Sequence, residues 1–179
     1  MTDTTLDYEI SGVCYELLPN EILCGLARQN YEEMEMCQYT KEEKELARTH
    51  AETLPPEQVK KEIENIGFNV VNNYIHDEVI PKDLADFYSI TGSSDIGDVS
   101  WLMPFSTIFT ATCPIGVNAH TWQAASASGN TLGQKGMLYA SKIMAGMFYD
   151  VVNDSKILEK ALTEFNQRTA GSPYECPIK

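Results

Sequence analysis

The hydrophobic residues of the chain recur with helical spacing in three segments. A helix is predicted over residues 20–36, because five apolar residues share one face: Leu23, Leu26, Ala27, Tyr31 and Met34. A second is predicted over residues 131–152, with a buried stripe of Met137, Ala140, Met144, Met147, Phe148 and Val151. A third follows over residues 154–168, with an inner face of Ile157, Leu158, Ala161, Leu162 and Phe165. We expect all three faces to be buried against the rest of the fold.

Two other segments favour strands. Residues 8–18 are rich in β-branched and aromatic side chains and end in a turn at Pro19, and residues 106–112 form a second strand-like run. Together with the helices, they predict an α/β fold in which part of a mixed sheet is flanked by helices. Gly136 and Gly146 fall inside a predicted helix, where each glycine costs about 1 kcal/mol relative to alanine. We therefore expect them to allow close packing against that sheet.

Residues 40–67 are strongly charged and predict two helices on the surface. Thr40 and Glu43 have the spacing of a capping box, and Pro56 suits the first turn of a second helix that ends at Gly67. Neither helix has a wide apolar stripe. We interpret the segment as a solvent-facing excursion whose glutamates are solvated.

The overall composition argues against several partners. The chain has 179 residues, with 26 Asp and Glu against 13 Lys and Arg, and its net charge is -13. Nucleic acids and anionic membrane surfaces both select basic patches, so neither is expected as a partner. No stretch approaches the roughly 20 apolar residues that span a bilayer, and residues 1–5 lack the features of a secretory signal. The five cysteines form no C-x-x-C pair, which is typical of a reduced, cytoplasmic protein.

The charge is also unevenly distributed along the chain. Residues 1–91 hold 19 acidic and 7 basic residues, whereas residues 92–179 are almost neutral. Between Gly92 and Gln134 only Asp95 and Asp98 are charged. Because charged residues are seldom buried without a partner, this stretch is predicted to face a core or to line a cleft.

The common nucleophile motifs are absent. The sequence contains no G-x-S-x-G elbow, no P-loop lysine motif and no G-x-G-x-x-G, which removes the usual signals for serine hydrolysis, P-loop phosphoryl transfer and dinucleotide binding. A Cys113–His120 nucleophilic pair is conceivable, but Cys113 precedes Pro114 in an apolar run and is typical of a buried small hydrophobe.

The residues alone do not decide whether the chain contributes to a metal site or to a substrate site. The histidines are His50, His76 and His120; we interpret the first as a surface residue and the second as part of a solvated turn. A catalytic zinc needs about three protein ligands, and no H-E-x-x-H or H-x-D motif supplies them, so His120 is either a ligand or an ordinary loop histidine. The loop at residues 91–98 could hold a substrate carboxylate or carbonyl, or it could be a turn with Ser94 or Asp95 capping a helix.

Three motifs carry a resemblance to a known family. They are Gly92-Ser93-Ser94-Asp95-Ile96-Gly97-Asp98-Val99-Ser100-Trp101, His120-Thr121-Trp122-Gln123 and Lys135-Gly136-Met137. Together they resemble the di-zinc metallopeptidase and amidohydrolase family that includes aminoacylases, glutamate carboxypeptidases and auxin-conjugate amidohydrolases, in its aminobenzoyl-glutamate branch. The similarity covers essentially the whole chain and is most specific over residues 92–137.

The resemblance implies a site. It makes His120 a ligand of a divalent metal, zinc with manganese as the other possibility, in the complete enzyme. It places a substrate-binding loop at Gly92, Ser93, Ser94 and Asp95, although many members carry glutamate where Ser94 stands. It also implies that residues 1–18 end an inserted dimerisation (lid) domain and that residues 19–179 are the carboxyl-terminal part of the catalytic domain, with a charged helical excursion at about 40–67.

The family's H-x-D pair and adjacent catalytic glutamates have no counterpart here. The acidic pairs Glu32-Glu33 and Glu42-Glu43 fall after the point where the inserted domain would end, so they do not match that motif. We therefore expect the carboxyl-terminal portion of a metal-dependent amidohydrolase that cleaves an amide such as p-aminobenzoyl-glutamate and is inactive as this chain alone. Its expected partners are the amino-terminal half of the enzyme or a second subunit, a small amide substrate, and further copies in a homo-oligomer.

Two alternatives stay open. The chain could be a non-catalytic subunit, or a truncated remnant, that completes an active site in trans or binds a partner. It could also have inherited only the fold of the family, in which case His120 would not matter for the activity of a reconstituted enzyme.

Overall fold

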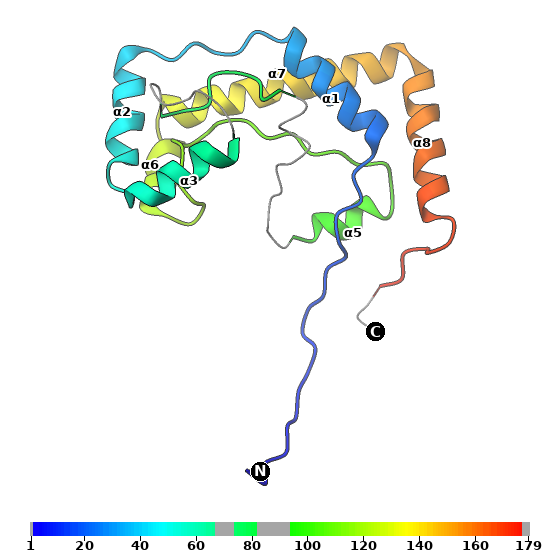
Figure 1. The fold of residues 1–179 in the computed structure, drawn as a ribbon. Coiled ribbons are helices and arrows are strands. Elements are labelled where there is room, and N and C mark those ends of the chain that lie inside the picture. Colours follow the sequence, from blue (N-terminus) through cyan, green and yellow to red (C-terminus); the bar gives the residue numbers. More distant parts are fainter. Residues whose placement is uncertain (1, 67–73, 82–93, 177–179) are drawn as a thin grey trace. The chain divides into compact units, whose positions relative to one another are not determined.

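The computed structural model describes residues 2–66, 74–81 and 94–176, and its regular elements are helices (Figure 1). They are α1 (Glu21–Glu33), α2 (Lys41–Ala51), α3 (Pro56–Ile66), α5 (Ile96–Ser100), α6 (Trp122–Ser128), α7 (Thr131–Asn153) and α8 (Ser155–Thr169). The predicted helices at 20–36, 131–152 and 154–168 are confirmed as α1, α7 and α8, and the two charged helices as α2 and α3. The predicted end of the second charged helix, Gly67, lies outside the described residues. Helix α6 was not predicted from the sequence.

The predicted α/β fold is wrong, because the described residues contain no strand and no sheet. The strand-like run at 106–112 is non-helical, but a strand requires a hydrogen-bonded neighbour. Here tyrosine side chains bond its backbone instead. The Tyr31 hydroxyl donates to the Phe109 carbonyl and accepts from the Phe109 N–H, both at 2.6 Å, and the Tyr39 hydroxyl donates to the Ala111 carbonyl at 3.3 Å. Residue preference for strands reflects a fit to a pleated surface and cannot supply the pairing partner.

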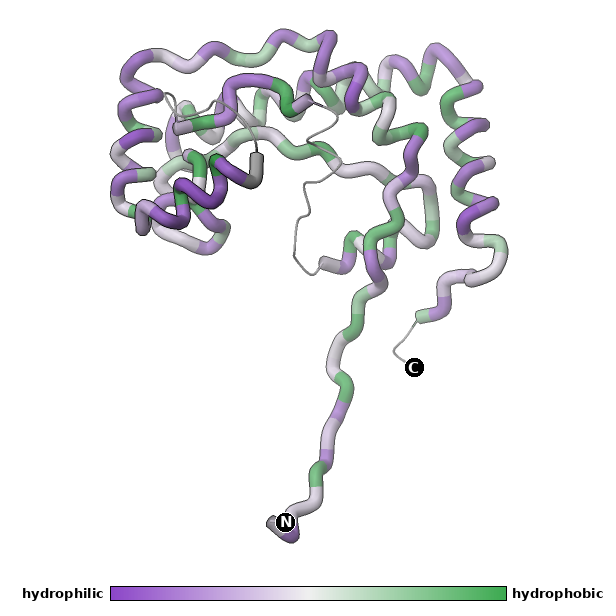
Figure 2. Tube along the Cα trace, viewed as in Figure 1, coloured by the Kyte–Doolittle hydropathy of each residue, from purple (hydrophilic) through white to green (hydrophobic). Residues whose placement is uncertain are grey.

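The chain forms two compact units. The terminal unit comprises Met1–Cys24, Thr91–Thr107 and Ser155–Lys179, and the central unit comprises Gly25–Ile90 and Ile108–Asp154. In the terminal unit, the extended amino-terminal segment alternates hydrophobic and hydrophilic residues (Figure 2), and Leu6, Tyr8 and Ile10 are all exposed. In the central unit, hydrophilic residues predominate along α2 (Figure 2), as its charge pattern predicted.

The core of the central unit is built on the amino-terminal half of α7. Leu132 is fully buried and packs with Ala47 of α2 and with Ile75. A Cβ atom added to Gly136 would lie 2.1 Å from the Ala111 carbonyl oxygen, and one added to Gly146 would lie 1.9 Å from Asn30 Oδ1. The prediction that both glycines allow close packing is confirmed. Their neighbours, however, are an extended segment and helix α1, not a sheet.

The predicted buried stripe of α7 is on the wrong face. The buried residues are Leu132, Gly133, Gly136, Tyr139 and Ile143. Three members of the predicted stripe, Met137, Met144 and Phe148, are 62%, 61% and 72% exposed. Because α7 is apolar around most of its circumference, periodicity alone could not choose the face that the core covers.

Two further burial predictions are wrong in part. On α8, Ala161 is buried as expected, but Leu158 and Leu162 are exposed. In the charge-poor stretch that was expected to be interior, Leu102, Phe109 and Trp122 are exposed. A low density of charge therefore did not guarantee burial within this chain.

None of the described helices combines the length and apolar character needed to cross a lipid bilayer.

Candidate functional site

His120 lies in the turn that precedes α6, and its side chain is exposed. Its backbone φ of 64° is in the left-handed region, which histidine adopts more readily than most residues. The neighbouring Thr121 hydroxyl donates to the Asn118 carbonyl at 2.9 Å and accepts from the Ala124 N–H at 3.2 Å, so Thr121 is the N-cap of α6. These two bonds hold the turn on both sides of His120.

Helix α6 is tied to α2 by a buried histidine. The Nε2 atom of His50 lies 2.9 Å from Ser126 Oγ, and its Nδ1 atom lies 2.8 Å from the Leu46 carbonyl oxygen. Since a carbonyl can only accept, Nδ1 carries the proton, and in the neutral ring Nε2 accepts from the serine hydroxyl. The His50 and Trp122 rings also lie 5.7 Å apart. The expectation that His50 is a surface residue is therefore wrong, because it is only 5% exposed.

A second pair of hydrogen bonds joins the same helices. Gln123 Nε2 donates to Thr53 Oγ1 at 3.0 Å, and Thr53 Oγ1 donates to the His50 carbonyl at 2.6 Å. The turn that carries His120 is thus continuous with a helix held by buried polar contacts. A threonine N-cap before an alanine-rich run was the available sequence signal for α6. Nothing in the local sequence indicates the contact of His50 with Ser126, which is 76 residues away.

The motif Lys135-Gly136-Met137 has a structural role in the central unit. Lys135 Nζ donates to Glu43 Oε2 at 2.6 Å and to the Gln38 carbonyl at 2.7 Å. Glu43 also accepts from the Thr40 N–H at 2.6 Å, and the predicted capping box is confirmed. Burial raises the pKa of Glu43, but hydrogen bonds from Lys135, Thr131 and Thr40 outweigh it and lower the pKa to about 2. Glu43 is therefore a buried, charged anchor and not part of a solvated face.

The proposed substrate loop is described only in part. Gly92 and Ser93 lie outside the described residues, whereas Ser94 and Asp95 are exposed and belong to the terminal unit. Ser94 Oγ accepts from the Ile96 N–H at 3.3 Å. Asp95 occupies the N-cap position of α5 but makes no side-chain capping bond. The described end of the loop thus opens a helix, and a contact with substrate stays a prediction.

Helix α5 approaches the extended amino-terminal segment closely. A Cβ atom added to Gly97 would lie 1.9 Å from the Tyr15 carbonyl oxygen. The Tyr15 ring lies 5.3 Å from the Trp101 ring and 5.0 Å from the Tyr174 ring. The Tyr174 hydroxyl donates to Asp98 Oδ1 at 3.0 Å, and this bond is the main reason that the pKa of Tyr174 is raised to about 12. An aromatic cluster therefore supports the residues that follow the loop.

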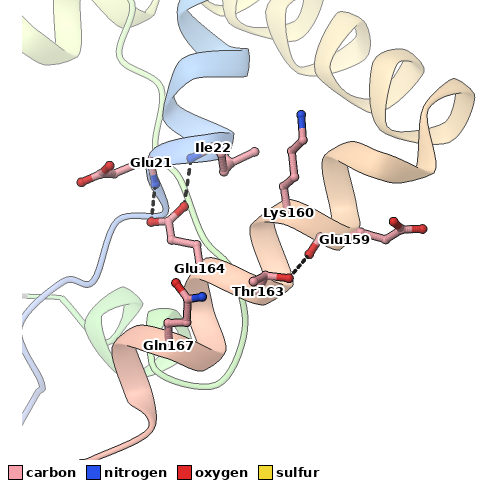
Figure 3. A pocket seen from close by; sticks show the side chains of 7 residues that line it. All are labelled: Glu21, Ile22, Glu159, Lys160, Thr163, Glu164 and Gln167. Atoms are coloured by element: carbon pink, nitrogen blue, oxygen red, sulfur yellow. Dashed lines mark hydrogen bonds between the residues drawn. The ribbon is translucent and has the colours of Figure 1, made fainter.

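The terminal unit also contains a hollow of about 460 Å³ where α8 meets the first turn of α1 (Figure 3). Its central group is Glu164, whose carboxylate accepts from the backbone N–H groups of Glu21 at 2.7 Å and Ile22 at 3.0 Å. Burial raises the pKa of Glu164, but these bonds and Arg168 outweigh it, so the pKa is lowered. The carboxylate already satisfies the exposed N–H groups of α1, and we assign the hollow a structural role.

The described donor set does not fit a complete metal site. No three His, Cys, Asp or Glu side chains within the described ranges come together in a way that could hold a metal ion. A catalytic zinc requires about three protein ligands and an open position. His120 offers one exposed imidazole, so no hydrolytic step is assigned to the described residues.

The chain is similar to a protein of known activity. It is 30% identical, over 189 aligned residues, to a subunit of the p-aminobenzoyl-glutamate hydrolase of Escherichia coli (strain K12). The alignment covers 99% of this chain and 39% of that protein, so the chain spans about two fifths of the length of its relative. No protein-family model matches the chain, and no solved structure matches it. The resemblance that the motifs indicated is therefore confirmed: the chain is a relative of this hydrolase subunit along nearly its whole length, consistent with a carboxyl-terminal part of that protein.

Proposed function

We propose that the chain is the carboxyl-terminal portion of a metal-dependent amidohydrolase that cleaves an amide such as p-aminobenzoyl-glutamate, and that it is inactive alone. The observation that carries this proposal is the similarity of 99% of the chain to the p-aminobenzoyl-glutamate hydrolase subunit of E. coli. In this proposal residues 1–18 end a dimerisation domain and residues 19–179 belong to the catalytic domain of a cytoplasmic homo-oligomer.

In the same proposal, His120 supplies one ligand to a divalent metal ion, zinc or manganese. The other ligands would come from the amino-terminal half of the enzyme or from a second subunit, because the described residues do not assemble a metal site. Two features support this role: the imidazole is exposed, and its turn is held by Thr121 and by the buried contacts of α6 with α2. The loop Gly92, Ser93, Ser94 and Asp95 would border the substrate.

The test uses a chimera in which this chain replaces its matching region in the E. coli relative. We expect the chimera, assembled with the relative's own partners, to hydrolyse p-aminobenzoyl-glutamate, and the purified chain alone to show no turnover. His120→Ala in the chimera should lower turnover by more than about 100-fold and reduce the bound metal, because a lost ligand weakens the site more than a lost supporting contact. His76→Gln is the matched histidine control. Metal-dependent turnover by the chain alone, or normal metal content in the His120→Ala chimera, would refute the proposal.

A second candidate function is a non-catalytic subunit or truncated remnant that completes an active site in trans or binds a partner. It is favoured by the fact that the relative is itself named as one subunit of a hydrolase. Mixing this chain with the separately expressed remainder of the relative distinguishes the two. Restored hydrolysis in the mixture supports completion in trans, whereas activity only in the covalent chimera supports a portion of one polypeptide.

A further inference from the structure

We propose that one face of α7 is a docking surface for the polypeptide that corresponds to the part of the hydrolase relative that this chain does not span. The inference rests on the proposed function and names the surface through which the missing part would assemble. The α7 face consists of six exposed residues: Met137, Leu138, Met144, Phe148, Tyr149 and Val152.

The α7 face is continuous along the helix. Met137, Met144 and Phe148 are spaced by seven and four residues and lie above one another, and Leu138, Tyr149 and Val152 widen the same side. The face runs for about 22 Å at 1.5 Å per residue. Its six side chains are between 51% and 72% exposed. They leave an apolar patch on the order of 500 Å², a size that in single-chain proteins often marks an interaction site.

The three charged side chains of α7 already have partners within the central unit. Lys135 pairs with Glu43, and Lys142 donates to the Glu35 carbonyl at 3.4 Å. Asp150 accepts from Asn30 Nδ2 at 2.8 Å. None of the six residues that form the α7 face is charged. The core of a protein interface is typically depleted in charged residues and enriched in methionine and aromatic residues.

Two uncharged polar side chains on this side of α7 are turned back onto the helix. Ser141 Oγ donates to the Met137 carbonyl at 2.9 Å, and Asn153 Nδ2 donates to the Tyr149 carbonyl at 2.7 Å. A partner that covers the face would therefore meet side chains that already have a hydrogen-bond acceptor on the helix. Exposed helices of this chain are built differently, since α2 carries Arg48 bonded to Glu45 and Glu52 on its surface.

The length of the relative indicates which polypeptide covers the α7 face. About three fifths of the E. coli hydrolase subunit have no counterpart in this chain, whereas nearly all of this chain is matched to the remaining two fifths. A second copy of this chain is the alternative occupant, and the experiment below distinguishes it by mass. The occupant is therefore the polypeptide that corresponds to the unmatched part of the relative, and it presents an apolar surface to α7.

The experiment follows peroxide oxidation of Met137 and Met144 by mass spectrometry, in the chain alone and in the chimera described above. Methionine oxidation depends on exposure, and the half-buried Met147 serves as an internal reference. We expect both methionines to be oxidised readily in the monomeric chain and about fivefold more slowly in the chimera. Met144→Lys with Phe148→Lys should abolish this protection of Met137. Thr49→Lys with Asn166→Lys adds the same charge at exposed positions elsewhere and should leave the protection intact.

Each other outcome overturns the proposal. Equal oxidation in chain and chimera shows that the missing part does not cover the face. Slow oxidation in the chain alone shows that another segment covers it if the mass is that of a monomer, or a second copy if the mass is doubled. Met144→Ala with Phe148→Ala, which adds no charge, repeats the test if the lysine variant fails to fold. A chimera that is protected but inactive contradicts only the proposed function, whereas an active, unprotected chimera contradicts only this inference.

Discussion

The Glu43–Lys135 ion pair makes the stability of the central unit depend on pH in a specific way. Glu43 is 7% exposed and receives hydrogen bonds from Lys135 and the Thr40 N–H, both at 2.6 Å. Its pKa falls from 4.5 to about 2 in the folded protein. A carboxylate whose pKa is depressed by folding stabilises the folded state fully above pH 4.5, and that contribution is lost as the pH falls toward 2.

Glu43→Gln keeps the shape of the side chain and removes its charge. The shift of about 2.5 pKa units corresponds to roughly 3 kcal/mol, and the partial exposure of Lys135 reduces the expected loss to about 2 kcal/mol at pH 7. For a chain of this size, that loss lowers the melting temperature by about 4–8 °C. The difference between wild type and variant should shrink steadily between pH 4.5 and pH 2.5.

The assay is urea denaturation followed by circular dichroism at pH 7, 4.5, 3.5 and 2.5, with wild type and variant measured side by side. Glu57→Gln is the matched control, because Glu57 is exposed in the first turn of α3. It should leave the free energy of unfolding nearly unchanged at every pH. A loss below about 0.5 kcal/mol for Glu43→Gln, or a loss that is the same at pH 7 and pH 2.5, would refute the reasoning.

Two pairs of substitutions test the packing of the central unit. His50→Ala removes a buried ring and its bonds to Ser126 and Leu46, and should lower the free energy of unfolding by about 2–3 kcal/mol. His120→Ala, at an exposed position, should change the free energy of unfolding little. Equal melting temperatures for the two variants would contradict the assignment of His50 as a buried contact. Gly136→Ala should destabilise by about 2 kcal/mol, because the new methyl group would lie 2.1 Å from the Ala111 carbonyl oxygen. Gly25→Ala on α1, where the added Cβ meets nothing within 4 Å, should instead stabilise the folded protein by about 0.5–1 kcal/mol. Thermal denaturation that ranks the two glycine variants in the opposite order would show that the close contact of Gly136 with Ala111 is wrong.

The helices could be predicted because their signals are local. The capping box of Thr40 and Glu43 and the start of α3 at Pro56 each depend on residues within one turn. The resemblance to the hydrolase family was equally accessible, since it rests on short motifs around Ser94 and His120. Neither kind of signal says which residues meet across the fold.

The candidate site shows the same division. The position of His120 next to a threonine could be read from the chain, but the anchoring of its helix by His50 depends on a contact over 76 residues. The assignment of Glu43 as solvated was wrong for a similar reason. Its partner Lys135 is distant in sequence, and a glutamate on a charged helix ordinarily faces water.

By itself, the sequence of this protein determined the positions of five of the described helices and which hydrolase it resembles, because helix caps, periodicity and motifs act over a few residues. Tertiary structure alone decided that the strand-like run at 106–112 is bonded by Tyr31 and Tyr39 instead of a neighbouring strand. It also decided which side of the apolar helix α7 is buried, since Gly136 and Gly146 admit close neighbours on one side only. Burial and pairing are properties of contacts between distant residues, and a residue's own preference cannot supply the partner that satisfies it.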